Sequence, residues 1–244
     1  MNDRLDNIGT LKDFQGFGDT DMNKKQLASY IDHTLLKAVA TEDAIKKLCL
    51  EAQTYRFAAV CVNPAHVELA SNELHGSSVK VCAVIGFPLG ANSYLVKGYE
   101  AAQAVKSGAE EVDMVINIGA LKSGKLAVLE KDITEVVSHA TGDNLATLVK
   151  VIIETCYLTD PEKVTACQIA VKAGAQFVKT STGFGTGGAD VHDIKIMRES
   201  VGPEIGIKAS GGISSYSQAA AMIEAGATRI GTSAGVQILS GAKG

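Results

Sequence analysis

The sequence lacks the residue spacing of a disulfide framework or a metal site. Its five cysteines are an odd number with no C-x-x-C pair, and its five histidines show no H-x-H or H-x-x-x-H spacing. Disulfide-rich secreted domains and zinc sites normally depend on such regular spacing. We therefore expect a reduced, cytoplasmic protein that uses no metal and no cofactor.

Long apolar runs and a surplus of positive charge are also missing. Apolar stretches such as Val81–Ile85 are far shorter than the ~20 residues of a membrane-spanning helix. The first 21 residues contain five aspartates and no apolar stretch, which argues against a secretion signal. The chain carries 27 acidic and 23 basic residues, a net charge of −4, whereas nucleic-acid-binding domains are usually basic. We expect neither a membrane nor a nucleic acid as partner.

What the sequence does contain is a repeated pattern. From about Tyr30 onward, short runs rich in Val, Ile and Ala alternate with amphipathic stretches, which is typical of strand–helix units around a parallel sheet. The expected strands are 30–34, 58–62, 79–86, 111–117, 147–153, 177–180, 206–209 and 228–231. The expected helices lie near 41–54, 64–74, 93–107, 125–140, 160–173, 190–200, 214–225 and 233–240. Thr41 and Thr159 are the expected N-caps of two of them.

Three similar tripeptides are centred on Gly108, Gly174 and Gly226, each between an expected helix and the next strand. Glycine there suits the left-handed residue that follows a helix. Eight strand–helix units predict a single-domain TIM (β/α)8 barrel, an α/β fold. The barrel would be the catalytic domain, 24–244, with a short helix ahead of strand one and a polar N-terminal extension over 1–23. An open doubly wound sheet is the alternative, but no glycine-rich dinucleotide fingerprint follows the first expected strand.

Three charged residues interrupt the expected strands: Asp113 in the fourth, Lys179 in the sixth and Lys208 in the seventh. We expect all three to point into the barrel, where a buried charge is costly unless it is paired or used. Desolvation and a second cation both favour the neutral amine of a lysine, which can attack a carbonyl to form a Schiff base while the carboxylate moves protons. The pattern leaves open which lysine is the nucleophile. It also fits a buried structural ion pair with a lysine reaching the rim.

Glycine-rich segments follow the expected sixth, seventh and eighth strands. In TIM barrels the loops after strands seven and eight often bind phosphate through backbone N–H groups. We therefore expect a substrate or phosphate site at Gly183, Gly211, Gly212, Gly231 and Ser233.

Six segments, in the same order, resemble the signature strands of the deoxyribose-phosphate aldolase family. They are 31–36, 60–64, 111–117, 151–155, 177–183 and 208–213. In that family the lysine at the position of Lys179 forms the Schiff base. The lysine at the position of Lys208 lowers the pKa of that nucleophile and helps proton transfer, and the aspartate at the position of Asp113 relays protons with the help of water.

The resemblance implies a class I aldolase that reversibly cleaves 2-deoxy-D-ribose 5-phosphate into D-glyceraldehyde 3-phosphate and acetaldehyde. The partner would be a small phosphosugar, and the family usually forms dimers or tetramers, so a homo-oligomer is expected. Two other classes are kept as alternatives: a non-catalytic phosphosugar-binding barrel, and a different class I Schiff-base lyase on the same fold.

Five further residues are expected to support the site: Asp32, Cys61, Lys150, Glu154 and Thr180. Asp32, placed at the end of strand one, would bond a substrate hydroxyl or pair with a lysine. Lys150 and Glu154 have the same parity in strand five, so both are expected to face inward as an orienting or a structural pair. Cys61 resembles a pocket-lining cysteine of the family and is not expected to be a nucleophile.

The sequence departs from the family at two loop positions. Some members carry a phosphate-holding lysine where this chain has Phe184, and some carry Ser-Ser where this chain has Ser233 and Ala234. Both changes concern the affinity for phosphate and leave the lysine chemistry untouched.

Overall fold

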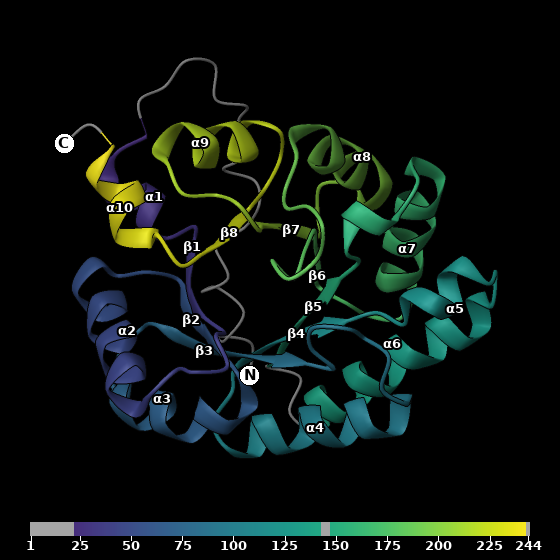
Figure 1. Cartoon of the computed structure of the whole chain (residues 1–244), viewed down its shortest axis with the longest axis horizontal. Coiled ribbons are helices and arrows are strands. Elements are labelled where there is room, and N and C mark those ends of the chain that lie inside the picture. Colours follow the sequence, from purple (N-terminus) through teal and green to yellow (C-terminus); the bar gives the residue numbers. More distant parts are fainter. Residues whose placement is uncertain (1–21, 143–146, 243–244) are drawn as a thin grey trace, which may run out of the picture.

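The protein is a closed parallel barrel of eight strands in the order β1 to β8, surrounded by helices (Figure 1). The computed structural model describes residues 22–142 and 147–242. The strands are β1 Ile31–Leu35, β2 Ala59–Val62, β3 Lys80–Ile85, β4 Glu111–Val115, β5 Leu148–Ile152, β6 Phe177–Lys179, β7 Gly206–Ser210 and β8 Arg229–Thr232. All eight expected strands are confirmed with shifts of at most two residues at either end, and so is the TIM-barrel fold.

The helices lie outside the sheet, mostly one after each strand, as Figure 1 shows. They are α1 Lys24–Ala28, α2 Glu42–Tyr55, α3 Val67–Glu73, α4 Tyr94–Lys106, α5 Ile118–Lys122, α6 Leu126–Thr141, α7 Asp160–Lys172, α8 Val191–Val201, α9 Tyr216–Glu224 and α10 Gly235–Ser240, with 3-10 turns η2 Pro64–His66 and η3 Thr155–Tyr157. The short helix expected before strand one is α1, which packs against α10. The five-residue helix α5 was not predicted. Most of the extension expected over 1–23 falls outside the described residues.

Local signals explain where several helices begin and end. The Thr41 side chain accepts a hydrogen bond from the N–H of Ala44 at 3.3 Å, and Thr159 forms a capping box with Glu162. Gly108, the first of the three tripeptide glycines, has φ +106°, and the other two also have positive φ. Only glycine adopts this conformation without strain, so these residues end α4, α7 and α9.

Two apolar clusters divide the molecule into layers. The larger one fills the space between the sheet and the helices, and includes Val60 and Val62 of β2. The smaller one lies inside the barrel and comprises Ala59, Cys61, Cys82 and Val84. Side chains alternate along each strand between these layers, so the inward positions of β2 and β3 are set by register. Among the described helices, none has the length and apolar character needed to cross a membrane.

A buried ion pair holds the carboxyl end of β4 against the outer helices. The Lys97 Nζ of α4 lies 2.7 Å from Asp132 Oδ2 of α6 and donates to the Val115 carbonyl at 2.9 Å. The N–H of Asn117 donates to the same carboxylate at 2.9 Å. Burial lowers the pKa of Lys97 and raises that of Asp132, so the pair depends on mutual contact for its charge. The end of the strand that carries Asp113 is fixed in this way from outside the barrel.

Candidate active site

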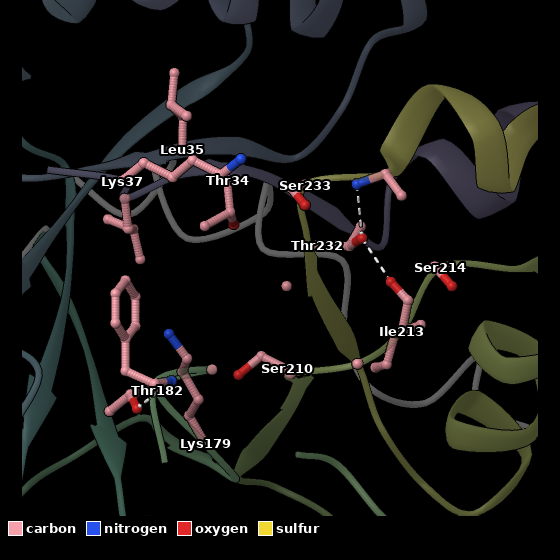
Figure 2. Close-up of a pocket in the computed structure, with 17 residues that line it drawn as sticks. Thr34, Leu35, Lys37, Lys179, Thr182, Ser210, Ile213, Ser214, Thr232 and Ser233 are labelled. Carbon is pink, nitrogen blue, oxygen red and sulfur yellow. Dashed lines mark hydrogen bonds between the residues drawn. The ribbon is translucent and has the colours of Figure 1, made fainter. Parts of the chain in front are cut away.

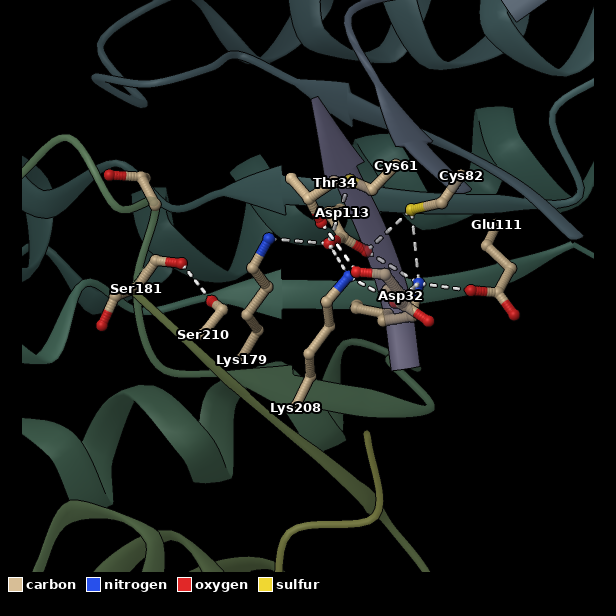
Figure 3. Close-up of polar contacts among 12 residues, drawn as sticks. Asp32, Thr34, Cys61, Cys82, Glu111, Asp113, Lys179, Ser181, Lys208 and Ser210 are labelled. Carbon is tan, nitrogen blue, oxygen red and sulfur yellow. Dashed lines mark hydrogen bonds and ion pairs between the residues drawn. The ribbon is translucent and has the colours of Figure 1, made fainter. Parts of the chain in front are cut away.

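Asp113 is the centre of a cluster of lysines inside the barrel (Figure 3). Its Oδ2 atom lies 2.7 Å from the Nζ atoms of both Lys179 and Lys208, and its Oδ1 lies 2.8 Å from the Nζ of Lys150. The register pairs Asp113 with Lys150 across β4 and β5, and Lys179 with Lys208 across β6 and β7. The expectation that Asp113, Lys179 and Lys208 point into the barrel is confirmed.

Beneath this centre the charges continue as a network. Asp32 forms ion pairs with Lys208 and, at 2.8 Å, with Arg229. Glu111 lies 2.6 Å from Lys150 and 3.4 Å from Arg229. Among the described residues the connected network holds four cations and three carboxylates. They are Lys150, Lys179, Lys208 and Arg229 against Asp32, Glu111 and Asp113. With all seven groups ionised this network has a net charge of +1, and loss of one proton from a lysine would reduce that charge to zero.

The electrostatic setting keeps most of these groups ionised. Burial alone would raise the pKa of Asp113, but Lys150, Lys179 and Lys208 outweigh it and hold that pKa well below its usual range. Burial likewise opposes the charged form of Lys208, but Asp113 and Asp32 raise its pKa above the ordinary value. The pKa of Lys150 is raised for the same reason, chiefly by Asp113. These contacts favour the charged forms of Lys150 and Lys208.

Two thiols complete the inner surface. The Cys82 Sγ lies 3.1 Å from Asp113 Oδ1 and accepts from Lys150 at 3.4 Å, while Cys61 Sγ is 4.0 Å from Asp113 Oδ2. Burial raises the pKa of the Cys82 thiol. The hydrogen bond between Cys61 and Cys82 lowers the pKa of the Cys61 thiol. The two sulfurs and Asp113 are close enough for a cation, but both carboxylate oxygens already contact ammonium groups. Cys61 is fully buried beside the Asp113 carboxylate and is not among the residues that line the pocket above the cluster, so the expectation of a pocket-lining cysteine is wrong.

A pocket of about 410 Å³ opens above the cluster at the carboxyl ends of the strands (Figure 2). It is lined by Lys179 and by all five residues expected to bind substrate or phosphate: Gly183, Gly211, Gly212, Gly231 and Ser233. Among the described lysines that contact Asp113, only Lys179 lines it. Phe184 lies at its edge, 56% exposed and edge-on to Phe87 at 5.3 Å between ring centroids.

The loops around the pocket are tied together by buried hydroxyl groups. The Thr232 hydroxyl accepts from the N–H of Ala234 at 2.9 Å and donates to the Ile213 carbonyl at 2.7 Å, which connects the loops after β8 and β7 (Figure 2). The Thr180 hydroxyl accepts from the N–H of Ser210 and donates to its carbonyl, both at 3.1 Å. Thr180 is thus a bridge between β6 and β7.

Glu154 holds the loop after β6. Its carboxylate accepts from the N–H of Thr182 at 3.2 Å and from the Thr182 hydroxyl. The expected pairing of Glu154 with Lys150 is wrong, because β5 ends at Ile152 and Glu154 turns away with φ 56°. Lys150 contacts Asp113 and Glu111 instead. A non-glycine residue at such a φ is strained and is often found at functional sites.

Asp32 is the second residue of β1, not its last, and lies below the pocket; of its two expected roles it has the pairing with a lysine. Sequence reasoning missed Cys82, Glu111 and Arg229 as network members, and Lys37 as a pocket residue. Glu111 could have been found, because it lies two positions before Asp113 and so shares its face of the strand.

Comparison with known proteins agrees with this geometry. The family model of the DeoC/LacD family aldolases matches residues 26–241. A deoxyribose-phosphate aldolase of Carboxydothermus hydrogenoformans is 61% identical over 220 residues, 90% of this chain and 96% of that protein. One of Streptococcus sanguinis is 62% identical over 216 residues, 88% and 96% of the two chains. The solved tetrameric deoxyribose phosphate aldolase from Aeropyrum pernix is 35% identical, with a TM-score of 0.83 over 89% of this chain and 91% of that one. The family expected from the six segments is confirmed, and the chain belongs to the DeoC/LacD family of aldolases.

Proposed function

We propose that the protein reversibly cleaves 2-deoxy-D-ribose 5-phosphate into D-glyceraldehyde 3-phosphate and acetaldehyde, with Lys179 as the Schiff-base nucleophile. The observation that carries this assignment is the position of Lys179. It contacts Asp113 at 2.7 Å and also lines the pocket, whereas Lys150 and Lys208 are fully buried below it. The names of relatives at about 60% identity support the substrate.

The reaction begins when the neutral amine of Lys179 attacks the aldehyde carbon C1 of the open-chain sugar. Loss of water leaves an iminium ion, which accepts the electron pair of the C2–C3 bond when that bond breaks. The C3 hydroxyl gives up its proton and becomes the aldehyde of glyceraldehyde 3-phosphate. The remaining enamine takes a proton at C2, and hydrolysis of the resulting iminium releases acetaldehyde and restores the amine.

Asp113 and Lys208 supply the charges and proton positions for these steps. The ionised carboxylate of Asp113 lies against Lys179 and can accept a proton, directly or through water. Lys208 shares the Oδ2 atom of Asp113 with Lys179, so it is the second cation beside the nucleophile and the group that activates its amine. Asp32 keeps Lys208 in place from the other side.

Trapping with a reductant tests the nucleophile. We expect that incubation with acetaldehyde and sodium borohydride leaves a reduced two-carbon adduct on Lys179, located by peptide mass spectrometry. Lys150 and Lys208 are the internal controls, because they have the same chemistry but no access to the pocket. An adduct on either of them would overturn the assignment to Lys179. A folded protein with no adduct would favour a barrel that binds phosphosugars without cleaving them.

We further propose that the chain forms a homo-oligomer. One solved relative is tetrameric, and large apolar side chains are exposed at the start of α4 and just before it, including Leu89, Leu95 and Tyr99. Exposed apolar groups of this kind often mark an interface. Light scattering coupled to size exclusion is expected to give a mass of two or four chains. Replacing Leu95 and Tyr99 together by glutamate should lower that mass if this surface is the contact. A wild-type protein with the mass of a single chain would contradict the proposal.

A further inference from the structure

We propose that Lys37 provides the positive charge that binds the phosphate group of the substrate. Lys37 lies on the segment after β1 and lines the pocket together with Gly211, Gly212 and Ser233. In Figure 2 its side chain lies along the rim of the pocket, on the side of Thr34 and Ser233 and away from Thr182. This inference rests on the proposed function, because it assigns a residue to the phosphate of that substrate.

The charge of the pocket favours an anion. Of the described residues that line it, none is acidic, and the two charged ones are Lys37 and Lys179. The ammonium of Lys179 is committed to Asp113 at 2.7 Å, and its amine is needed for the reaction. Within the described part of the chain, the Lys37 side chain has neither an ion pair nor a hydrogen bond, and it is exposed. It is therefore the lysine of this pocket that is free to meet a dianion.

The backbone that carries Lys37 is held in place. The Leu36 carbonyl accepts from Asn63 Nδ2 at 3.2 Å, which ties the segment to the end of β2. The Lys37 carbonyl accepts from the N–H of Ala40 at 3.0 Å, closing a turn. Only the side chain has to be ordered when a ligand binds, so the entropic cost of using this lysine is limited.

Barrel closure brings Lys37 to the glycine-rich loops. Strand β1 pairs with β8, with His33 opposite Thr232. The segment after β1 therefore runs beside the segment after β8, which carries Ser233. The glycine loops offer neutral N–H and hydroxyl donors that fix the position of a phosphate, and the ammonium adds the charge that they lack. The phosphate would lie between Lys37 and these loops, with the aldehyde end of the sugar toward Lys179.

The test compares two substrates that differ only in the phosphate group. For 2-deoxyribose 5-phosphate, we expect Lys37→Ala to lower kcat/KM about tenfold, mostly through KM, because an exposed charge-assisted contact is lost. For unphosphorylated 2-deoxyribose, kcat/KM should be unchanged. Lys37→Arg keeps the charge and should restore most of the loss. Lys46→Ala is the matched control, since Lys46 is an exposed lysine on α2 that does not line the pocket.

Inorganic phosphate gives a second readout. It should inhibit cleavage of 2-deoxyribose 5-phosphate competitively, and its inhibition constant should rise about tenfold in Lys37→Ala. Equal losses on both substrates, or no loss on the phosphorylated one, would overturn the role of Lys37. If the wild-type protein does not cleave 2-deoxyribose 5-phosphate at all, the proposed function itself fails, which is a separate and recognisable result.

Discussion

Replacing Lys179 with leucine is expected to reduce aldol cleavage by a factor on the order of 10⁴ or more, because removal of a covalent nucleophile eliminates the reaction path and leaves only binding. Lys179 is the lysine of the Asp113 cluster that lines the pocket, and neither Lys150 nor Lys208 can reach the substrate in its place. Turnover is measured by coupling the release of glyceraldehyde 3-phosphate to its oxidation.

The fold should survive this change. Asp113 keeps its contacts with Lys150 at 2.8 Å and Lys208 at 2.7 Å when Lys179 is lost, so its carboxylate is not left unpaired. Circular dichroism and the melting temperature should confirm folding, and Lys106→Leu, an exposed lysine at the end of α4, should keep full activity. A folded Lys179→Leu protein with normal turnover would contradict the Schiff-base mechanism.

The sequence predicted the barrel well because its strands are short apolar runs separated by capped helices. It also predicted that Asp113, Lys179 and Lys208 point into the barrel, because a charged residue inside an apolar strand stands out without knowledge of its partners. It did not predict α5, which has only five residues and follows β4 almost directly. So short an element has no room for a helical repeat of apolar residues.

The ion-pair network beneath Asp113 was harder to predict, because its members come from different strands and pair only when the barrel closes. Arg229 is the first residue of β8 and forms an ion pair with Asp32 of β1, and the pairing of β1 with β8 closes the barrel. That contact follows only from the closure of the sheet. The expectation for Glu154 failed for another reason: parity arguments hold while the strand continues, and β5 ends at Ile152. Beyond that point the left-handed backbone of Glu154 directs its carboxylate to Thr182.

Replacing Lys208 with leucine is expected to shift the pH dependence of the reaction as well as its rate. The Nζ atoms of Lys179 and Lys208 each lie 2.7 Å from the same oxygen of Asp113, so they are no more than twice that distance apart. At such a separation, the positive charge of one ammonium group disfavours a positive charge on the other. The Lys208→Leu variant loses this repulsion, so we expect the rising limb of kcat/KM to move to higher pH.

A structural role for Lys208 would give a different pattern, and two controls separate them. Lys208→Arg keeps a positive charge between Asp32 and Asp113, so it should lower the rate by misplacement but leave the rising limb near its wild-type position. Lys208→Leu leaves Asp32 paired with Arg229 and Asp113 paired with Lys150, so neither carboxylate is left without a cation and the variant should fold. Urea unfolding measures how much stability it loses. If Lys208→Leu is folded and slow but its pH profile is unmoved, Lys208 does not act through its charge on Lys179. A profile that moves to higher pH in Lys208→Leu and not in Lys208→Arg can arise only from the lost charge, since both variants disturb the packing of the same buried position.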